Sequence, residues 1–308
     1  MTWLWIPFTL LGAGGQVARN AMQRGLTKPL GTVGATHIRF LFGFPFSLLF
    51  LAVVLAATRA PLPTPADGFW PWLLLGALSQ IGATALMLAA MTERSFVVTT
   101  AYIKTEPVQA ALFGFAFLGD ALAPLKLIGI VVATLGVVVT ALWPGGGKGG
   151  VEGRAEERAM GFGSLRPTLL GLASAAGFAL SAVGYRGAIL ALDAASFVVA
   201  ATSTLVCGLL LQTIVLSVYL VLFDRHALIA IIRLWKPSMF AGFMGAFASQ
   251  FWFLAFALTA VANVRTLALV EVLFAQAVAL ISFKQPLSAR ELTGIVLIVA
   301  GVGVLLAG

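Results

Sequence analysis

Two similar stretches, one in each half of the chain, decide the fold: LIGIVVATLGVVV at residues 127–139 and LTGIVLIVAGVGV at residues 292–304. An offset of 165 residues places Gly129 on Gly294 and Gly136 on Gly301, with an Ile-Val pair after the first glycine of each stretch. The two glycines of a stretch stand two helical turns apart, so they share one face of a helix. We interpret these faces as places where helices pack closely.

The same offset aligns a residue type that is rare in apolar sequence, because it pairs Glu106 with Glu271. Apolar helices often match by chance, so matching glycines and carboxylates carry more weight. We therefore predict a duplication in which residues 1–143 and 168–308 are five-helix repeats and residues 144–167 are the linker. An odd number of helices in each repeat inverts the second copy in the membrane, an arrangement found in many secondary transporters.

The composition indicates a membrane protein. Of the 308 residues, 60% are hydrophobic and 10% are charged, against about 45–50% and about 25% in soluble domains. At about 20 residues per crossing, ten crossings would use about 200 to 230 residues and leave short connections. Because unpaired amides are costly in hydrocarbon, the spans must be helices. The predicted fold is an all-α integral membrane protein with ten transmembrane helices in two inverted five-helix repeats.

Apolar stretches bounded by Pro, Gly and charge give the ten expected helices. The first five are residues 3–23, 30–57, 69–91, 96–118 and 122–143. The second five are residues 168–190, 195–222, 238–259, 264–283 and 289–307. No basic residue precedes the first apolar stretch, so we expect a retained helix rather than a cleaved signal. The stretch between the two sets is rich in Gly and charge and has no apolar face to bury.

Several function classes are excluded by residue type. One cysteine, Cys207, allows no internal disulfide, and two histidines are too few for a zinc cluster, so we predict no metal site and no cofactor. The 19 Lys and Arg are scattered between apolar stretches, which argues against nucleic acid binding. No acid and nucleophile are paired, and no polar loop is large enough to hold a reaction site. We therefore expect no enzyme, and an integral membrane enzyme is a remote alternative.

Glu106 is the strongest candidate for a functional residue. It lies about ten residues into the fourth expected helix, where a charge costs a few kcal/mol, so it should face protein or water. Thr99, Tyr102 and Gln109 share its helical stripe, and Pro107 should kink the helix beside it. Glu106 either exchanges a proton or holds an ammonium group, or it is a neutral acid buried against another helix.

Other polar residues on the expected helices give further candidates. Gln16 and Asn20 lie on a polar stripe of the first helix, which should face a cavity or the membrane rim. Arg39 on the second helix is an anion contact, a partner of Glu106 or an interfacial anchor. Lys104 is rotated about 200° from Glu106, so it should pair elsewhere or reach toward the head groups. The weaker candidates are Gln80, Tyr185, Trp252 and Glu271.

Taken together, these residues resemble the ten-helix, EamA-type branch of the drug/metabolite transporter superfamily. The features that carry the resemblance are the doubled five-helix unit, Glu106-Pro107, Arg39, and a Gly-Asp-Ala-Leu segment at 119–122 followed by Gly129. The resemblance implies a basket-like bundle whose central cavity is lined by helices one to four and six to nine. It also implies export of amino acids, other metabolites or drugs.

The sequence departs from the family pattern at one loop. The family usually has Glu where Asp120 stands, and the second copy reads Lys-Gln-Pro-Leu at 284–287 with no acid. This weakens any role for the loop carboxylate.

The function expected from these features is secondary active transport that exports small organic solutes, such as amino acids, by alternating access. No ATP machinery is visible, so a gradient must drive uphill movement, and proton coupling is one option. Alternatives are an exchanger of anionic metabolites that uses Arg39, Lys104 and Arg265, a multidrug or cation exporter, and a channel. The partners are a small-molecule solute, the lipid bilayer and, with proton coupling, protons. A monomer and a homodimer both stay open.

We expect a multi-pass protein of the inner (plasma) membrane, but two arguments disagree on its orientation. The connections after helices one, three, five, seven and nine, together with the helix ends beside them, hold 13 Lys and Arg, and the opposite side holds Arg59, Lys126, Arg186 and Arg265. The positive-inside rule then places both termini outside, whereas the family resemblance implies that both are inside.

Overall fold

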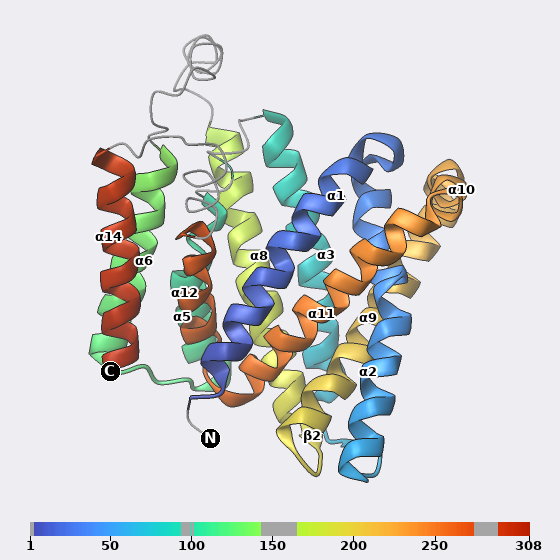
Figure 1. Cartoon of the computed structure of the whole chain (residues 1–308), viewed down its shortest axis with the longest axis horizontal. Helices are drawn as coiled ribbons and strands as arrows, with labels where there is room; N and C mark the ends of the chain where they lie inside the picture. Colours follow the sequence, from blue (N-terminus) through green and yellow to red (C-terminus); the bar gives the residue numbers. More distant parts are fainter. Residues whose placement is uncertain (1–2, 94–98, 100–101, 143–164, 274–288) are drawn as a thin grey trace. The chain divides into compact units, whose positions relative to one another are not determined.

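The computed structural model describes residues 3–93, 99, 102–142, 165–273 and 289–308, so most of the expected linker and residues 274–283 of the ninth helix lie outside it. Its elements are, in chain order, α1 (Trp5–Leu41), α2 (Gly43–Thr58), β1 (Thr64–Pro65), α3 (Phe69–Glu93), α5 (Glu106–Leu118), α6 (Pro124–Leu142), α8 (Leu165–Leu190), β2 (Leu192–Asp193), α9 (Phe197–Phe223), α10 (Arg225–Arg233), α11 (Trp235–Leu258), α12 (Val261–Leu267), the short 3₁₀ helix η1 (Ala268–Val270) and α14 (Ala289–Ala307) (Figure 1).

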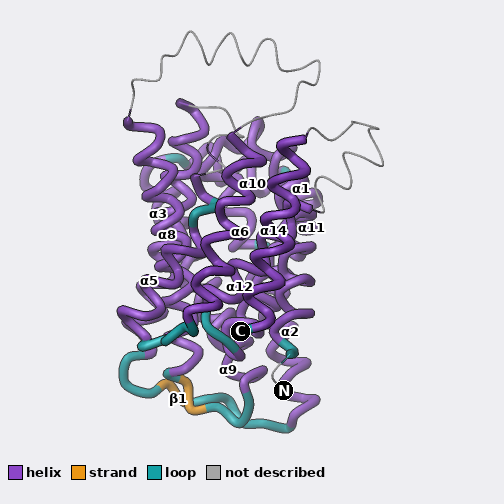
Figure 2. The backbone as a smooth tube through the Cα atoms, turned by 90° about the vertical axis from the view of Figure 1, so that its left-hand side faces the viewer, coloured by secondary structure: helices purple, strands orange, loops and turns teal. Residues whose placement is uncertain are grey.

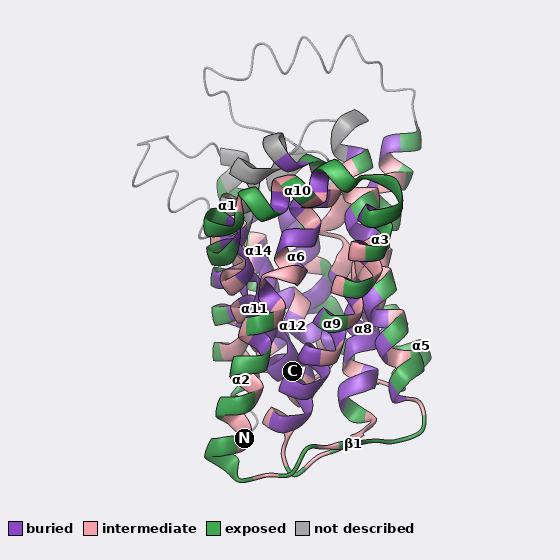
Figure 3. Ribbon diagram, turned by 90° about the vertical axis from the view of Figure 1, so that its right-hand side faces the viewer, coloured by how far each residue is buried: buried purple, intermediate pink, exposed green. Residues whose placement is uncertain are grey.

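The helices confirm an all-α membrane protein. Among the described residues, five helical segments are long and apolar enough to cross a bilayer, and three shorter apolar helices accompany them. Large apolar side chains such as Leu49 on α2 and Phe115 on α5 are more than half exposed, and Figure 3 shows exposed residues along both helices. A water-soluble surface would not carry so many, whereas lipid solvates them. The number of ten spans and their inversion stay predictions.

The chain packs as two compact units. Unit 1 consists of residues 1–81 and 180–259, and unit 2 consists of residues 82–179 and 260–308. Each unit therefore takes segments from both predicted repeats. The boundaries fall within α3 and α8, so these two helices contribute one part to each unit.

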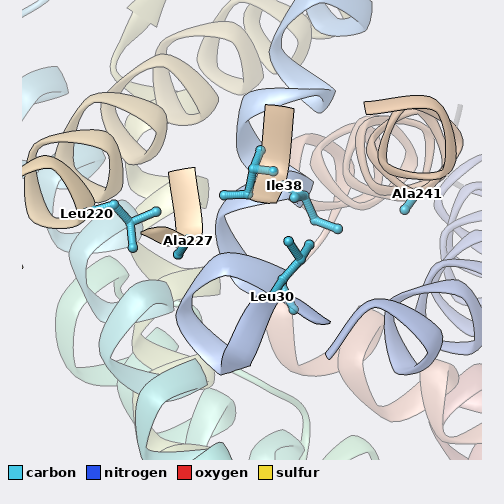
Figure 4. Packing of buried hydrophobic residues seen from close by; sticks show 7 residues of the cluster. Leu30, Ile38, Leu220, Ala227 and Ala241 are labelled. Atoms are coloured by element: carbon cyan, nitrogen blue, oxygen red, sulfur yellow. The ribbon is translucent and has the colours of Figure 1, made fainter. Parts of the chain in front are cut away.

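In unit 1, α1 packs along α11 and changes direction at a glycine. Gly31 has φ 65° and ψ 179°, a conformation that favours glycine and interrupts the helix. Figure 4 shows Leu30 and Ile38, from the two sides of this break, in an apolar cluster with Leu220 and Ala227. The expected connection at residues 24–29 is therefore wrong, because this stretch continues the helix up to the glycine.

Unit 1 also contains three elements that the apolar pattern did not predict. The strands β1 and β2 pair in antiparallel fashion, with Thr64 opposite Asp193, and join the connection after α2 to the connection after α8 (Figure 2). The helix α10 occupies the connection between α9 and α11, and Asp224 caps it by accepting a hydrogen bond from the amide of Ala227 at 3.1 Å. A nine-residue helix is too short to span a bilayer.

In unit 2, α6 packs against α14 through the glycines of the two similar stretches at residues 127–139 and 292–304. A Cβ atom on Gly129 would lie 2.7 Å from the carbonyl oxygen of Gly301, and one on Gly136 would lie 2.7 Å from that of Gly294. Real Cβ atoms do not approach other atoms so closely, so only glycine permits this backbone contact. The prediction of close packing at these glycine faces is confirmed.

This contact predicts that Gly301→Ala destabilises the protein, because the new methyl group meets the backbone of α6. We expect a cost of about 1–3 kcal/mol, the usual range for an overpacked core. The measurement is thermal unfolding of the purified protein in detergent. Gly303→Ala is the matched control, because Gly303 lies in the same helix with nothing within 4 Å of its added Cβ. Equal melting temperatures for the two variants would contradict the packing argument.

Candidate functional site

Glu106 forms an ion pair with Arg265 in unit 2. Its Oε1 lies 2.9 Å from Nε of Arg265, and each side chain is 14% exposed. Attraction between the opposite charges holds the pair. A carboxylate on an apolar helix is costly, and a cation at this distance offsets much of that cost.

Glu106 is the first residue of α5, not a residue within a continuous helix. The chain turns at Lys104 and Thr105, and α5 begins immediately after this turn. Pro107 follows in the first turn of α5, where its missing N–H group would have no helical partner in any case. The expected kink inside a helix over residues 96–118 is therefore wrong: the helix ends and a new one begins.

Thr105 connects the two sides of this break. Its hydroxyl donates to the carbonyl of Tyr102 at 2.6 Å and accepts from the side-chain amide of Gln109 at 3.1 Å. Gln109 is thus held one turn into α5, next to the start of the helix. Because the chain turns here, the expected stripe of Thr99, Tyr102, Glu106 and Gln109 does not continue as one helical face.

Glu271, the residue that pairs with Glu106 in the predicted duplication, lies at a second interruption. The helix α12 ends at Leu267, η1 follows, and helical structure resumes at Glu271. The Glu271 carboxylate forms an ion pair with Lys104, whose side chain is 18% exposed. Lys104 thus has a partner other than Glu106, as expected, but the rotation argument behind that expectation does not apply, because the chain turns at Lys104.

The two ion pairs cross between the predicted repeats. Glu106 of the first repeat pairs with Arg265 of the second, and Glu271 of the second pairs with Lys104 of the first. From the sequence, Arg39 is a candidate partner of Glu106 and Arg265 a candidate anion contact, whereas in the structure Arg265 pairs with Glu106. A usable signal was present, because a cation placed among apolar residues of the ninth helix needs a partner of opposite charge.

Tyr102 is held by α8. Its hydroxyl accepts a hydrogen bond from the hydroxyl of Thr168 at 3.1 Å. A Cβ atom on Gly171 would lie 2.7 Å from Cβ of Tyr102, so a glycine is needed at this position of α8. Unit 2 therefore contains four of the predicted site residues: Glu106, Glu271, Tyr102 and Gln109.

A polar network in unit 1 contains Gln80 and Tyr185. The side-chain oxygen of Gln80 accepts from the amide of Gln212 at 2.7 Å and from the Tyr185 hydroxyl at 3.4 Å. Gln212 also donates to the carbonyl of Ala77 at 3.3 Å. Sequence reasoning missed Gln212, although it is a buried amide in an apolar helix and such groups need partners.

The remaining candidates also belong to unit 1. Trp252 is 5% exposed and packs against Gly12 of α1, where an added Cβ would lie 3.1 Å from the indole ring. Gln16 is half-buried, and the side chain of Asn20 lies outside the described part of the structure. Arg39 is half-buried and lies beside Arg19 at Gly245 of α11. The predicted site residues thus form two groups, one in each unit.

The ion pair of Lys104 and Glu271 predicts a specific pattern of stability. Glu271→Gln leaves the largely buried ammonium group without its carboxylate, and we expect a loss of about 3–5 kcal/mol. The double variant Lys104→Met with Glu271→Gln should recover most of this loss, because no charge remains. The measurement is thermal unfolding in detergent, with Asp193→Asn on exposed β2 as the control. Additive losses in the double variant would show that the two groups are not coupled.

Comparisons with known proteins agree with this description. Residues 4–142 match the EamA-like transporter family. A comparison with curated proteins finds no match. The whole fold is similar to a crystal structure of another protein, with a TM-score of 0.69 and 17% identity over 99% of this chain and 97% of that chain. At this identity the likeness shows the fold alone.

Proposed function

Because residues 4–142 match the EamA-like transporter family, we propose that the chain is a secondary transporter that exports small organic solutes, such as amino acids, by alternating access. This match and the apolar helices indicate a multi-pass membrane transporter of the drug/metabolite type. Its solute, the direction of movement and its driving ion are the proposed part. We place it in the inner (plasma) membrane and assign it no catalytic activity.

The observation that carries the proposal is the ion pair of Glu106 and Arg265 at a helix interruption. Helices interrupted near the middle of the membrane are typical of the binding sites of secondary transporters, because they present polar groups there. A second interruption follows at Glu271, at the offset of the predicted duplication. Both interruptions carry an acid, and both acids have a basic partner.

We assign Glu106 the coupling role. A proton on Glu106 removes the negative charge that Arg265 faces, and so does a solute ammonium group that takes the carboxylate for itself. Either event leaves the guanidinium with a poorer environment, which favours a rearrangement of α12 relative to α5. Protons are therefore the proposed coupling ion, and Tyr102 and Gln109 are the proposed neighbours of the solute.

The glycine contacts support the inverted repeat. Gly129 meets Gly301, which is the duplicate of Gly136, and Gly136 meets Gly294, which is the duplicate of Gly129. A reciprocal contact of this kind is typical of a two-fold relation between the two elements. We propose on this basis that residues 1–143 and 168–308 are inverted five-helix repeats with ten spans.

The ion pairs also weigh against an anion exchanger that binds its solute with Arg39, Lys104 and Arg265. Lys104 and Arg265 each face a carboxylate, so their charges are already compensated within unit 2. Of the three cations assigned to that alternative, Arg39 alone belongs to unit 1. A multidrug or cation exporter would use Glu106 in the same way as an amino acid exporter, and a solute panel separates the two.

The test is transport of amino acids and related amines by proteoliposomes that contain the full chain. Glu106→Gln keeps the size of the side chain and removes its charge. We expect pH-dependent transport to fall by at least about tenfold, equivalent to about 1.4 kcal/mol. Asp193→Asn on the exposed strand β2 is the control and should transport as the unmodified chain does.

Two outcomes would contradict the proposal in different ways. An unchanged rate and pH dependence in Glu106→Gln would remove this residue from the mechanism. A chain that shows no saturable flux and no counterflow with any amino acid, amine or organic anion would contradict the transport function itself.

A further inference from the structure

The two helices that α10 connects hold it at the boundary of the membrane. Both α9 and α11 are long and apolar enough to cross a bilayer. Asp224 alone separates α9 from α10, and Leu234 alone separates α10 from α11. Phe223 and Trp235, the neighbouring residues of α9 and α11, are both exposed, as lipid-facing side chains are. The short helix therefore lies at the level of the lipid head groups.

One face of α10 packs against the rest of unit 1. Ala227 and Ile231 lie one turn apart, both are buried, and they share an apolar cluster with Leu30 and Leu220. A Cβ atom on Gly34 of α1 would lie 3.7 Å from Cβ of Ala227, an ordinary contact distance. This packing fixes the rotation of α10 about its own axis, so the opposite face is turned away from the unit. Figure 3 shows both buried and exposed residues along the helix.

The opposite face of α10 carries basic and apolar side chains next to each other. At about 100° per residue, Ile229 lies about 180° from the centre of the buried face, with Arg225 and Arg233 about 40° to either side. All three side chains are exposed. Exposed Lys236 follows at the start of α11, with its Nζ 5.8 Å from the centre of the Trp235 ring. We call Arg225, Arg233 and Lys236 the basic face.

The charge of the basic face exceeds that of the acids beside it. Residues 224–236 hold three cations and one acid, Asp224, whose carboxylate accepts from the amide of Ala227 and caps α10. Among the described residues, no carboxylate forms an ion pair with the basic face. Arg225 donates through Nε to the carbonyl of Val221 at 2.8 Å, which uses one of the five N–H groups of its guanidinium. The basic face therefore retains both charge and hydrogen-bond donors for an anion.

We propose that the basic face binds the phosphate groups of anionic phospholipids, while Ile229 and Ile232 lie at the boundary of the acyl chains. A short helix with such a mixed outer face is typical of segments that lie in the plane of the interface. Basic residues beside a span attract anionic lipids, and guanidinium groups match the paired oxygens of a phosphate. Phosphatidylcholine compensates its phosphate with its own ammonium group, whereas phosphatidylglycerol does not. The exposed isoleucines between the cations favour lipid over an acidic protein surface.

The first experiment measures lipid binding. The full chain is purified in an uncharged detergent and depleted of lipid, and its melting temperature is followed as phosphatidylglycerol or phosphatidylcholine with the same acyl chains is added. We expect phosphatidylglycerol to raise the melting temperature with saturation, at lower concentrations than phosphatidylcholine. Replacing one cation of the basic face by Gln should weaken half-saturation about fivefold, and replacing all three about a hundredfold. A triple variant that keeps the full response to phosphatidylglycerol would overturn the proposal.

Two further variants separate a binding role from a structural one. The double variant Arg233→Gln with Lys236→Gln keeps the hydrogen bond of Arg225 to Val221. It should melt as the unmodified chain does without lipid, because both side chains are exposed, and still bind phosphatidylglycerol about thirtyfold more weakly. Arg59→Gln is the matched control, because Arg59 is an exposed cation at the end of α2. Equal lipid responses in the double variant and in this control would overturn the proposal.

Further additions distinguish lipid from other occupants of the basic face. Glycerol phosphate and inorganic phosphate offer a phosphate without acyl chains, and they should have no effect at concentrations where phosphatidylglycerol saturates. A response equal to that of the lipid would assign the face to a soluble anion and overturn the proposal. A dimer that persists in phosphatidylglycerol and is lost in the double variant would assign the face to a second copy and also overturn it. None of these measurements uses transport, so they test this proposal independently of the proposed function.

Discussion

The cost of a charge in hydrocarbon is the constraint on which the rest of this structure depends. Four ionisable residues lie together in unit 2, and each has a partner of opposite charge: Glu106 with Arg265, and Lys104 with Glu271. The pairs join α5 and the turn before it to α12 and the residues after η1. Removing one member would leave a charge in a place that solvates it poorly, so the four residues act as a set.

The helix interruptions, like the ion pairs, involve polar groups that hydrocarbon cannot solvate. A continuous helix satisfies its own amides and presents only side chains, whereas an interrupted helix places backbone ends beside its neighbours. The turn at Lys104 and Thr105 and the 3₁₀ segment before Glu271 put both acids at such ends. Glu106 in particular lies in the first turn of α5, where the helix dipole favours a negative charge.

The sequence was a good guide to helices and glycine contacts and a poor guide to their interruptions. A long apolar stretch predicts a membrane-spanning helix, because lipid solvates its side chains. The helix α14, Ala289–Ala307, has the bounds expected for the tenth helix. The glycine faces were predictable because backbone contact leaves few other residue types possible. Helical periodicity, however, assumes an unbroken helix, so it missed the turn before Glu106. Helical periodicity also contains no information about Arg265, the partner of Glu106, which lies more than 150 positions further along the chain.

The two acids have similar positions but different surroundings, and this difference bears on which repeat performs the chemistry. The chain around Glu106 carries polar side chains: Thr105 hydrogen-bonds to Gln109, and the hydroxyl of Tyr102 accepts from Thr168. Before Glu271 the chain reads Leu-Ala-Leu-Val at 267–270, which offers a solute no polar side chain. An acid without polar neighbours can stabilise a fold, but it cannot orient a small polar molecule by itself. In the proposed mechanism, Glu106 of the first predicted repeat is therefore the carboxylate that meets the solute, and Arg265 of the second predicted repeat is the cation from which it separates.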